Sequence, residues 1–225
     1  VANIDPRQVA NMIGLGRFSP RVQRRLDYDY SPSNFMIYAT VQGIDLRDYG
    51  FGQWNTFHNS IDDINEAFSQ MHDKGDYSQP SFAITTPGMM TDDASDRPQG
   101  EQIIEFLTVA DFNQFRLLAE DRGAYLQKKR EIVDAIFDVV EAHYIPEFRR
   151  HVSFKVSGSP TTNARFCRAP MGNSYGSILT PENVGRNRLS HDSSITGLVF
   201  CNASAGYPGF AGAFWNGRSA FRKLL

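Results

Sequence analysis

Two hydrophobic periodicities constrain the fold of this chain most strongly. Residues 34–42 alternate between apolar and polar, which puts four apolar side chains on one side: Phe35, Ile37, Ala39 and Val41. Residues 124–144 instead place their apolar side chains at helical spacing: Tyr125, Ile132, Val133, Ile136, Phe137 and Val140. A period of two predicts a half-buried strand, and a period of 3.6 predicts an amphipathic helix. The chain must therefore combine helices with a sheet.

Other segments extend this mixture of elements. Residues 81–86, 102–109 and 152–156 have the composition of strands, and the weak alternation of 102–109 indicates burial on both faces. Asp5 and Pro6 form a helix start, and Gly14 fits the position just past that helix. A second helix is expected after Ser60, Asp62 and Asp63. Its apolar stripe is Ile64, Ala67, Phe68 and Met71. A long loop is expected over 87–100. The pattern predicts an α+β (mixed α/β) fold whose mixed β-sheet is flanked by helices.

The last thirty residues carry a different kind of pattern. An apolar run over 198–201 leads into a loop of small residues that holds Gly206, Gly209 and Gly212, and a helical pattern then continues toward residue 225. Small residues let a backbone approach a bound group closely. The free N–H groups and the dipole of a helix start attract negative charge. This arrangement predicts a site for a large anionic cofactor.

Several short segments match motifs of one flavoprotein family. At the C-terminus these are residues 197–200 (Gly-Leu-Val-Phe), 208–209 (Pro-Gly) and 216–218 (Asn-Gly-Arg). Residues 3–6 are similar to the family's exit from its FAD-binding domain, and residues 159–166 with 170–176 are similar to its re-entry. The chain thus resembles the C-terminal part of FAD-dependent oxidoreductases of the phytoene desaturase, carotenoid isomerase and retinol saturase branch.

The resemblance implies a domain division and a set of contacts. Residues 1–10 would be the tail of an FAD-binding domain, 11–157 a substrate-binding domain, and 158–225 the return to an incomplete FAD-binding domain, as a strand, loop and helix. Flavin contacts are expected from Asn202, Ala203, Ser204, Gly209, Phe210, Ala211 and Gly212. Contacts to an apolar, polyene-like substrate are expected from Tyr38, Phe166 and Tyr175. Because flavin performs the redox chemistry, no catalytic side chain is assigned.

The dinucleotide-binding fingerprint of such enzymes is not met here. Residues 14–19 (Gly-Leu-Gly-Arg-Phe-Ser) lack the third glycine, and a helix rather than a strand precedes them. Residue 1 is valine rather than methionine. The expectation is therefore that the missing N-terminal FAD-binding segment belongs to a longer flavoprotein, and that this chain alone is inactive.

The composition of the chain limits which binding partners and which cellular compartment are expected. The chain has 23 Lys and Arg against 25 Asp and Glu, with no evident basic patch, so nucleic acid is not an expected partner. Two cysteines, Cys167 and Cys201, indicate reduced thiols and a cytoplasmic setting. No apolar run approaches the length of a spanning helix, so any membrane association is expected to be peripheral.

Two other functional classes remain open at this stage. One is a non-catalytic domain that binds a small molecule or a protein. The other is a serine hydrolase, because residues 172–176 (Gly-Asn-Ser-Tyr-Gly) match the G-x-S-x-G pattern around Ser174. That pattern requires a strand before it and a helix after it, and His191 is the only later histidine. The five histidines show no metal-ligand spacing, so no metal site is expected.

Overall fold

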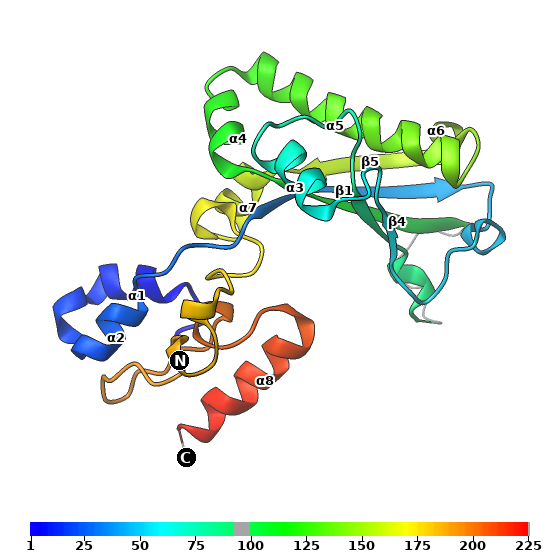
Figure 1. The fold of residues 1–225 in the computed structure, drawn as a ribbon. Coiled ribbons are helices and arrows are strands. Elements are labelled where there is room, and N and C mark those ends of the chain that lie inside the picture. The colour runs from blue at the N-terminus through cyan, green and yellow to red at the C-terminus, as the bar shows by residue number, and fades with distance from the viewer. Residues whose placement is uncertain (92–99, 225) are drawn as a thin grey trace. The chain divides into compact units, whose positions relative to one another are not determined.

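The computed structural model describes residues 1–91 and 100–224, and the chain divides into two compact units (Figure 1). The first unit combines Val1–Pro32 with Asn163–Leu225. The second unit is the continuous segment Ser33–Thr162. The expected division at residues 10 and 157 differs, because residues 11–32 fold with the C-terminal segment rather than with the sheet.

The second unit contains a five-stranded sheet with the order β2-β3-β4-β1-β5. Its strands are β1 (Ser33–Gln42), β2 (Thr56–His58), β3 (Phe82–Thr85), β4 (Glu101–Ala110) and β5 (Val152–Gly158). The observed fold is α+β, as expected. Every pair in this strand order is antiparallel, so the sheet is not mixed in strand direction. Pairing direction depends on long-range partners, which a local hydrophobic pattern does not specify.

Among the described residues of the second unit, helices pack on one face of this sheet and not on the other. Phe35, Ile37, Ala39 and Val41 of β1 are buried, as their alternation predicts. They pack in one core with the apolar side of α5 (Arg122–His143), which runs along the sheet in Figure 1. Burial along β4 also alternates, so the expectation that this strand is buried on both faces was wrong. The helices cover only the face that carries Ile104 and Phe106.

The remaining helices of the second unit are α3 (Ile64–His72), α4 (Phe112–Leu118) and α6 (Phe148–His151). Aspartates cap α3 and α4, whereas α6 has no side-chain cap. Asp63 caps α3 by accepting from the backbone of the first turn. Of the predicted α3 stripe, Ala67 and Met71 are buried, whereas Ile64 and Phe68 are exposed. The predicted stripe was therefore only half correct.

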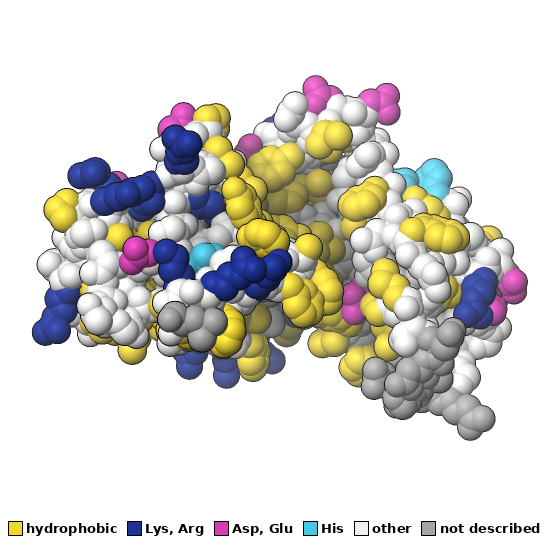
Figure 2. Space-filling model, turned by 90° about the horizontal axis from the view of Figure 1, so that it is seen from below, with side chains coloured by type: hydrophobic (Ala, Val, Ile, Leu, Met, Phe, Trp, Pro, Cys, Tyr) yellow, Lys and Arg dark blue, Asp and Glu magenta, His cyan; other side chains and the backbone are white. Residues whose placement is uncertain are grey.

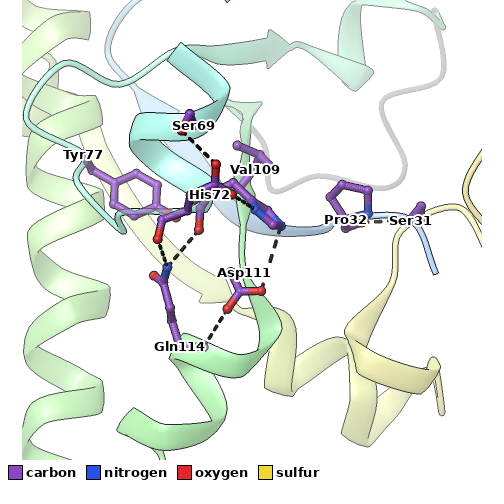
Figure 3. A network of polar contacts seen from close by, with 9 residues as sticks. Ser31, Pro32, Ser69, His72, Tyr77, Val109, Asp111 and Gln114 are labelled. Atoms are coloured by element: carbon purple, nitrogen blue, oxygen red, sulfur yellow. Dashed lines mark hydrogen bonds and ion pairs between the residues drawn. The ribbon is translucent and has the colours of Figure 1, made fainter. Parts of the chain in front are cut away.

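A polar network fastens the turn after α3 to the start of α4 (Figure 3). The His72 ring lies 2.8 Å from the Asp73 carboxylate and 3.9 Å from that of Asp111. The Gln114 amide donates to the His72 carbonyl at 2.8 Å, and the Tyr77 hydroxyl donates to the Val109 carbonyl at 3.0 Å. All of these partners are backbone or neighbouring caps, so the network serves the fold.

The first unit is built from helices and loops. Its helices are α1 (Pro6–Ile13), α2 (Pro20–Arg25) and α8 (Gly209–Arg222), and α7 (Pro160–Phe166) crosses the boundary between the units. Asp5 caps α1 and Gly14 ends it with a positive φ of 95°, as expected. Val9, Phe18, Val22 and Phe200 share one core, which draws residues 11–32 into this unit.

The strand expected over 197–200 does not form as a regular element. Phe200 makes a single parallel bridge to Ala2, and Val199 makes a single antiparallel bridge to Asp192. Only Val199 and Phe200 of this segment are buried, and Gly197 is an exposed turn residue with a φ of 81°. Thr180 precedes a short 3-10 helix over Pro181–Asn183. Part of the loop expected over 87–100 lies outside the described residues.

No helix in the described part of the chain is both long and apolar enough to cross a membrane.

Candidate functional site

The two units carry opposite charge. The first unit holds twelve Lys and Arg against five Asp and Glu, a net charge of +7. The second holds eleven against twenty, a net charge of −9. The balanced whole-chain composition hides this division, because basic residues at both ends of the sequence fold into one unit. Figure 2 shows Lys and Arg side chains over one face of the first unit, at the left of the view. Charge counts over the whole chain therefore understate the positive charge of the first unit.

A pocket of about 290 Å³ lies within the first unit. Three segments line it, residues 3–8, 167–176 and 202–203, and we call it the polar pocket. Its lining includes amide, hydroxyl and guanidinium groups from Asn3, Gln8, Arg168, Asn173, Ser174 and Asn202. Its volume is at the low end for small-molecule sites, so it can hold part of a dinucleotide but not all of one.

Hydrogen bonds join the three segments that line the polar pocket. The Asn202 amide donates to the Asn3 carbonyl at 3.3 Å, and the Cys201 N–H donates to the Ala2 carbonyl at 2.8 Å. On the other wall, the Gln8 amide donates to the Arg168 carbonyl at 3.0 Å. Segments almost two hundred residues apart in sequence are therefore held in register around the cavity.

Asp5 lies in the pocket wall, but its carboxylate is committed to the protein. Its oxygens accept from the Tyr28 hydroxyl at 3.1 Å, the Tyr30 hydroxyl at 3.0 Å and the Arg7 N–H at 2.9 Å. Burial, followed by the nearby Asp5 charge, raises the pKa of both Tyr28 and Tyr30 well above the usual range. Both hydroxyls therefore stay protonated as donors, and Asp5 acts as a scaffold for the pocket.

Arg188 holds the loop that follows the polar pocket. Its guanidinium is buried and donates to the carbonyls of Ala203, Gly206, Ser177 and Asn183. Burial lowers the pKa of this group. No carboxylate forms an ion pair with it among the described residues. The loop is thus fixed by hydrogen bonds around a positive charge that no acidic side chain neutralises.

The first turn of α8 follows this loop and lacks a side-chain cap. Pro208 occupies the N-cap position and offers no side-chain acceptor to the first N–H groups. Gly212 lies against the Tyr207 carbonyl, where an added Cβ would approach the oxygen to 2.4 Å. Because Gly212 has no side chain, the Tyr207 carbonyl can lie against the first turn of α8. Uncapped N–H groups at the start of a fourteen-residue helix favour an anionic group.

The expected flavin contacts fall into three places. Asn202 and Ala203 line the polar pocket. Ser204 is fully buried, and its hydroxyl accepts from the Ser177 N–H at 2.9 Å, so it packs behind the pocket. The others, Gly209, Phe210, Ala211 and Gly212, form the first turn of α8 and do not line the polar pocket. Sequence reasoning missed Arg188, for which no local pattern gave a signal.

The expected substrate residue of the second unit lies on the uncovered face of the sheet. Tyr38 on β1 is in register with Glu105 on β4 and Val156 on β5. On either side of this row, the same pairing places further apolar side chains on that face: Met36, Leu107, Ile103, Phe154 and Phe57. We call this surface the open sheet face. It is largely apolar, and Tyr38 stands at its centre, 42% exposed.

The other two expected substrate residues belong to different parts of the chain. Phe166 ends α7 and is 73% exposed, with the Arg165 guanidinium 5.3 Å from its ring centre. Tyr175 lies between the lining residues Ser174 and Gly176, and its N–H donates to the Ser31 hydroxyl at 2.9 Å. Neither side chain lines the polar pocket.

Ser174 does not have the surroundings of a hydrolase nucleophile. It lies in a turn that follows the 3-10 segment Pro170–Gly172, not between a strand and a helix. Its hydroxyl is buried and has no hydrogen-bond partner among the described residues. The His191 ring is hydrogen-bonded to the Phe200 carbonyl at 3.0 Å. No general base is therefore placed to activate this serine.

No group of three His, Cys, Asp or Glu side chains in the described part of the chain is placed to hold a metal ion. Among known proteins, no family model matches this sequence, and no curated protein matches it.

Proposed function

We propose that this chain is the substrate-binding and C-terminal flavin-contacting part of an FAD-dependent oxidoreductase that acts on an apolar polyene. The observation that carries the proposal is the loop from Asn202 into α8. It passes from a polar pocket to an uncapped helix start, within a unit of net charge +7. A flavin dinucleotide needs both a polar cavity and a cationic environment for its pyrophosphate.

The donor set of the polar pocket suits the neutral, hydroxyl-rich part of such a cofactor. The side-chain amides of Asn202 and Asn3 can exchange hydrogen bonds with sugar-alcohol hydroxyls. The pyrophosphate would lie at the α8 start, where the N–H groups of Gly209 and Phe210 precede the first helical bonds. Because the pocket holds about 290 Å³, the remaining cofactor surface would need a second protein segment.

Substrate binding is proposed for the second unit. The open sheet face offers an apolar surface around Tyr38, whereas the opposite face is filled by the core. An apolar polyene would gain hydrophobic free energy by covering such a surface. When bound, the flavin supplies the hydride transfer, and the residues named here bind and orient.

Absorbance of the protein expressed from its complete native reading frame tests the proposal. A flavin spectrum that is released on denaturation is expected. Ala203→Trp should reduce FAD retention, because the larger side chain fills the pocket wall. Ala213→Trp, at an exposed position of α8 outside the polar pocket, is the matched control.

Colourless wild-type protein that also fails to take up added FAD would exclude the flavoenzyme, and a non-catalytic binding domain would then be the better description. Equal FAD loss in both tryptophan variants would show that the polar pocket is not the flavin site. Thermal unfolding of each variant distinguishes a blocked pocket from a damaged fold.

A further inference from the structure

A second concave site lies in the first unit, separate from the polar pocket. It has a volume of about 480 Å³ and shares no lining residue with the polar pocket. Four arginines line it: Arg21 and Arg25 from α2, Arg186 from the loop that follows residue 184, and Arg188. We call it the arginine pocket. Its size suits a small organic ligand rather than a single ion.

The arginines of this pocket have no acidic partners. None of Arg21, Arg25 and Arg186 forms an ion pair among the described residues. Arg25 donates to the Arg186 carbonyl, which holds the loop against α2. The side chains of Arg21 and Arg186 are exposed and make no hydrogen bond in the described part of the chain. Two guanidinium groups are therefore available to a ligand.

Bringing these charges together is unfavourable without an anion. Besides burial, the neighbouring Arg21 and Arg24 lower the pKa of Arg25, which reflects their mutual repulsion. The buried Arg188 also lines the pocket and adds a further positive charge. Against these, Asp192 is the one carboxylate in the lining, and it already accepts from the Ser194 N–H at 2.9 Å.

The remaining lining favours phosphate over other anions. Ser190 and Ser194 supply hydroxyl donors beside the guanidinium groups, a combination that binds phosphate oxygens. No aromatic ring lines the pocket, so a nucleic acid would find no surface for base stacking there. We infer that the arginine pocket binds the phosphate group of a small organic phosphate, through Arg21 and Arg186.

Calorimetric titration with inorganic pyrophosphate tests this site. The double variant Arg21→Gln/Arg186→Gln should bind at least about tenfold more weakly, because two charge-assisted contacts are lost. Arg17→Gln/Arg222→Gln removes the same charge from exposed positions of the same unit outside the pocket. It should change the affinity less than about threefold, since only long-range attraction is reduced.

A third variant tests whether the loss of a negative charge from the pocket strengthens pyrophosphate binding. Asp192→Asn removes the only carboxylate of the lining but keeps an oxygen to accept from Ser194. Pyrophosphate should therefore bind more tightly to Asp192→Asn than to the wild type. Circular dichroism of each variant confirms that the fold is retained.

Vesicles distinguish the two sources of such a phosphate. Binding of pyrophosphate supports a soluble ligand, and binding only to phosphatidylcholine vesicles that contain phosphatidic acid supports a lipid headgroup. Both must depend on Arg21 and Arg186. The inference is overturned if the wild type binds neither probe, or if the double variant and its control lose affinity equally. Tighter binding to longer oligonucleotides, with equal losses in both double variants, would overturn it in favour of nucleic acid.

Discussion

The side-chain amide of Asn216 is hydrogen-bonded to both backbone groups of Tyr207. Its Nδ2 donates to the Tyr207 carbonyl at 2.9 Å, and its Oδ1 accepts from the Tyr207 N–H at 3.1 Å. Asn216 is buried on α8, so the helix fixes the course of the loop that precedes it. The loop that is proposed to bind the cofactor is therefore held in place by α8.

Alanine substitutions at two glycines of α8 test whether the preceding loop packs tightly against the helix. An alanine Cβ at Gly212 would lie 2.4 Å from the Tyr207 oxygen, whereas one at Gly217 would have no neighbour within 4 Å. Gly212→Ala should destabilise the protein by about 1–3 kcal/mol through overpacking. Gly217→Ala should stabilise it by up to about 1 kcal/mol through helix propensity. Denaturant unfolding measures the change in the free energy of unfolding for each variant. Equal changes at the two positions would contradict tight packing of the loop against α8.

The tyrosines bound to Asp5 predict how stability depends on alkaline pH. Burial, then Asp5, raises the folded-state pKa of Tyr28 above that of an unfolded tyrosine, near 10. The neutral hydroxyl thus stabilises the fold fully below about pH 10, and this contribution is lost as pH rises further. Tyr28→Phe should lower stability by about 1 kcal/mol at neutral pH, because a hydrogen bond is lost.

The measurement is urea unfolding at a series of pH values. Above about pH 10 the free energy of unfolding should fall less steeply in Tyr28→Phe than in the wild type, since one group of raised pKa is absent. Between pH 7 and 9 the two slopes should agree. Parallel curves throughout would show that Tyr28 ionises alike in the folded and unfolded protein.

The open sheet face predicts where a polyene is bound. Val156, 51% exposed in register with Tyr38, and Leu117, 58% exposed on α4, are apolar positions of similar exposure. Val156→Asp should weaken retinol binding by about fivefold or more, because the ligand would cover a charge. Leu117→Asp should leave it unchanged. Retinol fluorescence provides the readout, and equal affinities of the two variants would move the substrate site elsewhere.

Much of the local structure could be predicted from short-range patterns. The alternation of β1, the apolar side of α5 and the cap at Asp5 are all found as expected. Each is encoded by residues within a few positions of one another, so a local pattern is enough to predict it. Asn202 and Ala203, expected from the adjoining loop of small residues, line the polar pocket, and their contact with a flavin stays a prediction.

The features that were not predicted depend on contacts between residues that are far apart in the sequence. The buried Arg188 and the pocket wall at Asp5 each depend on segments that meet only in the folded chain. The same holds for the one-sided burial of β4, which is decided by α5 on the covered face. A local pattern records which residues are apolar, but not which partner will bury them.

The sequence by itself determined the α+β composition, the bounds of its clearest helices and strands, and the loop that leads into α8. The tertiary structure decided the antiparallel order of the sheet, the opposite charges of the two units, and the polar pocket and arginine pocket of the first unit. The physical reason is that helix and strand propensities act over a few residues, whereas pockets and electric fields arise where distant side chains come together.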